Sequence, residues 1–146
     1  MKTTLYALLL SLVVLPAHAA VKQSQLRALE RQIVEEKWPA CVSPRNYYDR
    51  VYCSSKVYNL LDTSLNERYI ALRKTLSDGQ KQRLKKVQVA WIRERDDQCA
   101  SIQEDSVIMD LGCTKARTVE SLYYITEMNK NPQDFDLLLQ EYKRRE

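Results

Sequence analysis

The chain has 146 residues, of which 45% are hydrophobic, 29% are charged and only two are glycine, and its formal net charge is +4 at pH 7. This length suits one domain with its own hydrophobic core, and the scarcity of helix breakers among long polar stretches predicts an all-α fold. The positive charge is too modest for the dense basic surface that nucleic-acid binding favours, so we expect no nucleic-acid partner.

Residues 1–19 have the pattern of an export signal. Lys2 precedes an apolar run at residues 5–15, and Ala17-His18-Ala19 fits a signal-peptidase site. The run is shorter than the roughly 20 apolar residues that span a membrane, and no cysteine follows it for lipid attachment, so we expect a periplasmic or secreted product without a membrane anchor. Cleavage there would leave one domain, residues 20–146, without a histidine, which removes the most common general base and zinc ligand.

The first predicted helix covers residues 21–38. Leu26, Leu29 and Ile33 share one face at helical spacing, which we interpret as packing within the domain, and Pro39 ends the helix. Residues 48–61 are compatible with a further helix. Side chains here that could pack inward or near the next helices are Tyr47, Tyr48, Val51, Tyr52, Tyr58 and Leu61.

Two antiparallel helices over residues 62–99 form the predicted centre of the domain. In the first helix, one face carries Leu65, Tyr69, Leu72 and Leu76. We expect this helix to start at Asp62-Thr63-Ser64, because these side chains can cap free amides and Ser64 has a glutamate three residues later.

The second of these helices should follow a short turn at Ser77-Asp78-Gly79. Gly79 can adopt the left-handed conformation that ends a helix, and Asp78 can cap the next one. The face expected to point inward carries Leu84, Val87, Gln88, Trp91 and Arg95.

Residues 100–112 are predicted to form a loop with a helical turn. The loop is acidic at Glu104, Asp105 and Asp110, and it also contains Val107 and Ile108. Two interpretations remain open: the loop packs on its own domain, or it displays acidic and apolar side chains to the cleft of a partner.

Two more helices complete the predicted bundle. Residues 114–129 place Val119, Leu122, Tyr123 and Thr126 on one side, and Asn131-Pro132 should cap and begin the last helix. The buried stripe of that last helix should consist of Phe135, Leu138, Leu139 and Tyr142.

The residues of the central helix pair also resemble a known family. The matching positions are Asp62, Leu65, Asn66, Tyr69, Leu72, Gln88, Trp91, Arg95 and Asp96. Together with the cysteines, they resemble the lysozyme inhibitor LprI-like N-terminal domain over about residues 41–122. The resemblance implies a small, mostly helical exported domain stapled by two disulfides, Cys41 with Cys53 and Cys99 with Cys113. Counting alone allows three pairings of four cysteines.

The candidate chemistry of the chain is sparse. Arg95 and Asp96, with Asp62 and Asn66 on the facing helix, could form a network that fixes the register of the two helices or a ligand site, and we favour the structural role. The cysteine spacings lack a close pair of metal ligands, and neighbouring carboxylates such as Glu94, Asp96 and Asp97 point in different directions on a helix. We therefore expect no metal, no cofactor and no enzyme activity.

The sequence and the resemblance together favour a non-catalytic, exported protein-binding domain. Inhibition of lysozyme by steric occlusion of its cleft is the function that the resemblance implies, with Glu104, Asp105 and Asp110 as candidate partner-binding residues. Animal lysozymes are basic, so a positively charged inhibitor would depend on such a local acidic cluster. The alternative is a structural or accessory envelope protein with an unrelated partner.

Overall fold

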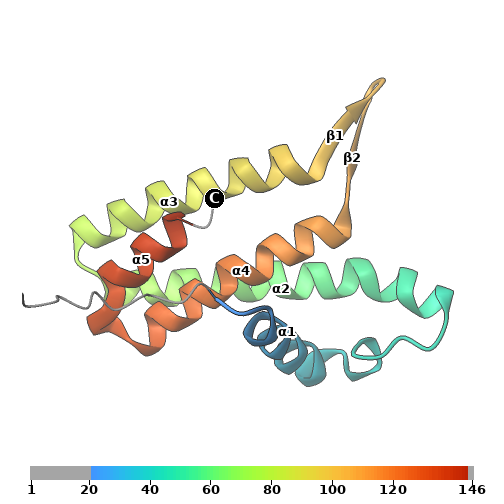
Figure 1. Ribbon diagram of the computed structural model, residues 1–146, viewed down its shortest axis with the longest axis horizontal. Coiled ribbons are helices and arrows are strands. Elements are labelled where there is room, and N and C mark those ends of the chain that lie inside the picture. Colours follow the sequence, from blue (N-terminus) through green and yellow to red (C-terminus); the bar gives the residue numbers. More distant parts are fainter. Residues whose placement is uncertain (1–20, 145–146) are drawn as a thin grey trace, which may run out of the picture.

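The structure is a computed structural model that describes residues 21–144, and within them it contains five α-helices and one short β-hairpin (Figure 1). In chain order the elements are α1 (Gln23–Lys37), η1 (Pro39–Cys41), α2 (Tyr47–Thr75), α3 (Asp78–Cys99), β1 (Ala100–Gln103), β2 (Ser106–Met109), α4 (Leu111–Lys130), η2 (Pro132–Asp134) and α5 (Phe135–Arg144). The prediction of a small, disulfide-stapled all-α fold is confirmed. The predicted export signal lies outside the described residues.

Helix α4 is the element on which the others pack. It contacts α1, α2, α3 and α5, and its contact with α2 is the most extensive between any two elements. Helices α2 and α3 run antiparallel, as expected (Figure 1). They have few direct contacts with each other, because both rest on α4.

The sequence of α4 explains its central position. Nine of its side chains are buried, and they point in several directions around the helix: Thr114, Thr118, Val119, Ser121, Leu122, Tyr124, Ile125, Thr126 and Met128. Small hydroxyl residues allow close packing, and each buried threonine donates its hydroxyl to the carbonyl four residues earlier. Thr118, for example, donates to the carbonyl of Thr114 at 2.8 Å. The single stripe predicted for this segment therefore identified only part of its core.

Helix α2 is one continuous helix of 29 residues, so the predicted start at Asp62-Thr63-Ser64 is wrong. Its N-cap is Asn46, whose Oδ1 accepts a hydrogen bond from the amide of Asp49 at 2.9 Å. No glycine or proline lies between residues 47 and 75, so nothing interrupts the helix. The buried side chains that run along it are Cys53, Val57, Leu61, Leu65 and Leu72.

The turn between α2 and α3 also differs from the prediction. Ser77, not Asp78, caps α3, and it forms a capping box with Gln80, whose Oε1 accepts from the Ser77 amide at 3.0 Å. Gly79 lies in the first turn of α3, and no described glycine has a positive φ. The capping box makes a left-handed glycine unnecessary, because extended backbone at Leu76 and Ser77 already reverses the chain.

Two disulfides join elements that are close in sequence, in the pairing that the family resemblance implies. Cys41 with Cys53 ties η1 to the start of α2, and Cys99 with Cys113 ties the end of α3 to the start of α4. Among residues 21–144, no helix is long and apolar enough to span a bilayer.

Candidate functional site

The segment between the second pair of cysteines is a β-hairpin, so the predicted loop with a helical turn is wrong. Strands β1 and β2 pair antiparallel, with Ile102 opposite Val107 and Gln103 opposite Ser106. The two remaining residues, Glu104 and Asp105, make the turn, and Glu104 has a φ of 53°. The β-branched residues on both sides of a two-residue turn were the sequence signal for strands.

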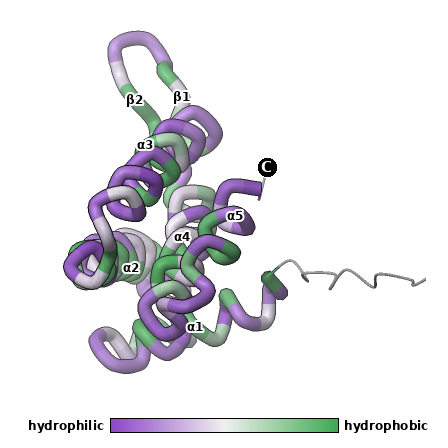
Figure 2. Tube along the Cα trace, turned by 90° about the vertical axis from the view of Figure 1, so that its left-hand side faces the viewer, coloured by the Kyte–Doolittle hydropathy of each residue, from purple (hydrophilic) through white to green (hydrophobic). Residues whose placement is uncertain are grey.

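The β-hairpin projects away from the helices, and its apolar side chains are exposed (Figure 1). The facing residues Ile102 and Val107 are 81% and 70% exposed, and Ile108 is 48% exposed. Figure 2 shows hydrophobic residues in both strands and a hydrophilic tip. Contiguous exposed apolar side chains on a projecting element are typical of a protein-binding surface.

The base of the hairpin is held from both sides. Cys99 and Cys113 close it covalently, and the amide of Asp110 donates to the carbonyl of Cys99 at 2.8 Å. A two-stranded ribbon is only marginally stable by itself in water. The disulfide therefore compensates for the absence of a third strand.

The three candidate acidic residues do not lie together. Glu104 and Asp105 form the exposed tip of the hairpin, whereas Asp110 is at its base. Asp110 is the N-cap of α4, and its Oδ1 accepts from the amide of Cys113 at 2.9 Å. The acidic surface available to a partner at the tip therefore consists of two carboxylates.

Five of the family-motif residues meet where α2 and α3 approach each other: Asp62, Asn66, Trp91, Arg95 and Asp96. Arg95 lies with one nitrogen 2.9 Å from a carboxylate oxygen of Asp96 and another 3.5 Å from Asp62, and its guanidinium lies 5.0 Å from the ring centre of Trp91. Asn66 donates to Asp62 at 3.4 Å. The Arg95 side chain is 11% exposed, so the network offers little room for a ligand.

Tyr58 lies beside this network in a partly buried position. Burial raises the pKa of Tyr58 above its ordinary value, and the charge of Asp62 raises it further, while the Arg95 guanidinium acts in the opposite direction. The phenol therefore stays neutral at physiological pH.

The other polar side chains give no arrangement for acid–base or metal chemistry among the residues described. Glu94 lies 4.0 Å from Arg117, Asp96 is paired with Arg95, and Asp97 is exposed, so these acids do not face one another across a pocket. No group of three metal-ligating side chains occurs in residues 21–144.

A second exposed apolar surface, which the sequence did not reveal, lies around the start of α2. Tyr47, Tyr48, Val51 and Tyr52 are exposed there, so the prediction that they could pack inward or near the next helices is wrong. The same helical end is tied to η1 by the disulfide of Cys41 and Cys53, and these four side chains nevertheless remain exposed. Lys56 lies 4.7 Å from the ring centre of Trp38 and continues this surface toward η1.

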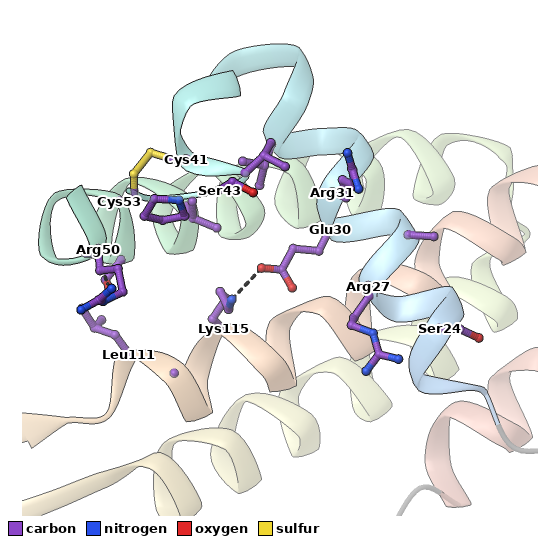
Figure 3. A pocket seen from close by; sticks show the side chains of 17 residues that line it. Ser24, Arg27, Glu30, Arg31, Cys41, Ser43, Arg50, Cys53, Leu111 and Lys115 are labelled. Atoms are coloured by element: carbon purple, nitrogen blue, oxygen red, sulfur yellow. Dashed lines mark hydrogen bonds and ion pairs between the residues drawn. A yellow bond between two sulfur atoms is a disulfide. The ribbon is translucent and has the colours of Figure 1, made fainter. Parts of the chain in front are cut away.

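A pocket of about 730 Å³ lies between α1, η1 and the first turns of α2 and α4 (Figure 3). Its walls include Val34, Val57 and the Cys41–Cys53 disulfide. Near the middle, Lys115 of α4 forms an ion pair with Glu30 of α1 at 2.6 Å.

Comparison with protein families gives one match. The model described as "Lysozyme inhibitor LprI" matches residues 41–130, which include both disulfides, α2, α3, the hairpin and α4. No curated protein and no solved structure matches the chain significantly. The match extends beyond the resemblance noted in the sequence to the end of α4.

Proposed function

The chain belongs to the lysozyme inhibitor LprI family, and on this premise we propose that it is an exported, non-catalytic protein that binds a lysozyme and blocks its cleft with the β-hairpin. The observation that carries this proposal is the pair Ile102 and Val107, which face each other on a projecting ribbon and are 81% and 70% exposed.

Three features of the hairpin suit this role. Apolar side chains in the middle of the ribbon can be buried against a partner, which supplies most of the binding free energy in protein interfaces. The acidic tip, Glu104 and Asp105, complements basic groups of a lysozyme. The disulfide at the base fixes the ribbon before binding, so little conformational entropy is lost on association.

The proposed mechanism is steric. A projecting two-stranded ribbon can enter a cleft that normally receives an extended substrate. The helices would then remain outside and limit the depth of insertion (Figure 1).

The test is an assay of cell-wall hydrolysis by a c-type lysozyme in the presence of the oxidised chain, residues 20–146. We expect saturable inhibition by the parent and at least about a tenfold loss of potency for Ile102→Ser with Val107→Ser, since each buried aliphatic side chain contributes about 1.5–3 kcal/mol.

The matched control is Ile70→Ser with Ile92→Ser, which changes two exposed isoleucines on α2 and α3. This control should inhibit as well as the parent. Equal potency of the hairpin variant and the parent would exclude the hairpin as the binding element, and absence of inhibition by the oxidised parent would exclude the inhibitor function itself.

The aromatic surface at the start of α2 favours a second candidate function, an accessory envelope protein with an unrelated partner. The hairpin mechanism leaves Tyr48 and Tyr52 without a role, although both are exposed. If this candidate is correct, Tyr48→Ser with Tyr52→Ser will abolish retention of the chain by immobilised envelope extract, and lysozyme will be unaffected by the parent.

A further inference from the structure

The pocket between α1, η1, α2 and α4 is strongly basic. Its lining includes four cationic side chains, Arg27, Arg31, Arg50 and Lys115, and a single carboxylate, Glu30. Glu30 is engaged with Lys115 at 2.6 Å. The pocket therefore carries an excess of positive charge.

Two of these cations are available to a ligand. Arg31 is paired with Glu35 at 3.0 Å. Neither Arg27 nor Arg50 forms an ion pair within residues 21–144. Figure 3 shows Arg27 and Arg50 on opposite sides of the Lys115–Glu30 pair, so the pocket offers cationic groups from two directions.

The interior of the pocket is mostly apolar. Val34 and Val57 line it together with Leu111 and the disulfide of Cys41 and Cys53. A ligand that suits both the cations and this interior must carry carboxylates and apolar side chains close together.

The tip of the β-hairpin has this combination. Its turn consists of Glu104 and Asp105, and the second cross-strand pair from the turn is Ile102 with Val107, both exposed. The tip of one copy is therefore complementary to the pocket in charge and in apolar surface.

The position of the pocket relative to the hairpin allows each of two copies to place its hairpin tip at the pocket of the other. Leu111 and Gly112, which follow the hairpin after Asp110, line the pocket, so the pocket lies near the base of the hairpin. Each strand of four residues extends roughly 10 Å, which carries the tip away from its own base. In two antiparallel ribbons placed side by side, each tip comes to the base of the other.

We propose that two copies of the chain form a two-fold symmetric dimer in which the hairpin tip of each copy docks into the basic pocket of the other. Glu104 and Asp105 of one copy meet Arg27 and Arg50 of its partner, and Ile102 and Val107 cover the apolar wall. Both contacts are equivalent, so the assembly closes at two copies.

The dimer has a consequence that rests on the proposed function. The ribbon that binds lysozyme is buried in the dimer, so self-association and inhibition exclude each other. Inhibition should then come from the monomer, and its apparent potency should fall as the chain is concentrated.

The test is a reciprocal charge exchange followed by sedimentation velocity of the oxidised chain, residues 20–146. The tip variant carries Glu104→Lys and Asp105→Lys, and the pocket variant carries Arg27→Glu and Arg50→Glu. We expect a concentration-dependent monomer–dimer equilibrium for the parent and at least about a tenfold weaker association for each variant alone, because like charges then meet in both contacts.

An equimolar mixture of the two variants should form a heterodimer with an affinity similar to that of the parent, since opposite charges meet again in both contacts. This recovery cannot come from a variant that fails to fold, and circular dichroism verifies folding of each separately. The matched controls are Glu67→Lys with Asp97→Lys and Lys85→Glu with Arg93→Glu, which reverse exposed charges on α2 and α3 and should associate like the parent.

The proposal is overturned by a parent that stays monomeric at several hundred micromolar, by variants that associate as tightly as the parent, or by a mixture that stays monomeric. Each of these results leaves the lysozyme assay unaffected, so failure of the dimer and failure of the proposed function are distinguished.

Discussion

At the scale of single residues, Gln88 shows how a polar side chain on a core-facing stripe is accommodated. It is buried on α3, and its Oε1 accepts a hydrogen bond from the hydroxyl of Tyr142 on α5 at 2.7 Å. The same hydroxyl lies against Oγ of Ser121 on α4. One buried network thus connects three helices, and its members are satisfied by one another.

Removal of the Tyr142 hydroxyl tests this network. We expect Tyr142→Phe to lower the free energy of unfolding by about 1–3 kcal/mol, because Gln88 and Ser121 lose a buried partner while the ring packing remains. Urea unfolding followed by circular dichroism measures the change. Tyr47→Phe, at an exposed tyrosine, should stay within about 0.5 kcal/mol of the parent. A fully stable Tyr142→Phe variant would mean that the Gln88 amide satisfies itself elsewhere.

At the scale of elements, the two disulfides close loops of similar length and serve different elements. Cys41 and Cys53 are 12 residues apart, and Cys99 and Cys113 are 14 apart. By the chain-entropy estimate each contributes about 3 kcal/mol to stability. Only the disulfide of Cys99 and Cys113 lies at the base of the β-hairpin, so removal of the other disulfide is a matched control for its effect on the hairpin.

Replacing Cys99 and Cys113 by serine should release the hairpin while the helices remain folded. We expect a loss of about 2–4 kcal/mol in stability and an increase in amide hydrogen exchange at Ser101 and Ile108, a hydrogen-bonded pair of the ribbon, since an isolated ribbon is marginally stable. Hydrogen exchange followed by NMR measures this protection.

The corresponding Cys41 and Cys53 replacement should lose a similar amount of stability and keep the slow exchange of the ribbon. Equal exchange rates in the two variants would show that the helix ends, rather than the disulfide, order the hairpin.

The elements also show what the sequence could predict. Helical spacing correctly located the inward face of α3, because Leu84, Gln88 and Trp91 repeat at intervals of three and four residues. Possible caps misled the prediction within α2. Asp62 and Ser64 can cap a helix. However, α2 has buried side chains both before Asp62 and after Ser64, and their packing makes one continuous helix more stable than two.

The candidate site was predictable in part. The acidic and apolar character of residues 100–112 was visible in the sequence, and so was the closure by cysteines. The strand pairing was not recognised, because four-residue strands give little periodicity and the helical context dominated. The basic pocket could not be predicted, since Arg27, Arg50 and Lys115 come together only through the packing of three helices.

At the scale of the whole molecule, cohesion depends on α4, because α1, α2, α3 and α5 all pack on it while α2 and α3 contact each other little. Such an arrangement should unfold as one unit, since no pair of peripheral helices retains a core once α4 is lost. The fully buried Ile125 lies on this central helix.

Ile125→Ala should therefore destabilise the whole chain rather than one part of it. We expect a loss of about 2–5 kcal/mol from the removed methyl groups and the cavity they leave. The measurement uses a Trp38→Phe background, in which Trp91 on α3 is the remaining tryptophan and reports a helix other than the mutated one. Fluorescence and far-ultraviolet circular dichroism should give coincident urea transitions at the same lowered midpoint. Ile92→Ala, at a more exposed position on α3, should change the midpoint much less. Separate transitions in the Ile125→Ala variant would show that α2 and α3 keep a core of their own, and the central role assigned to α4 would then be incorrect.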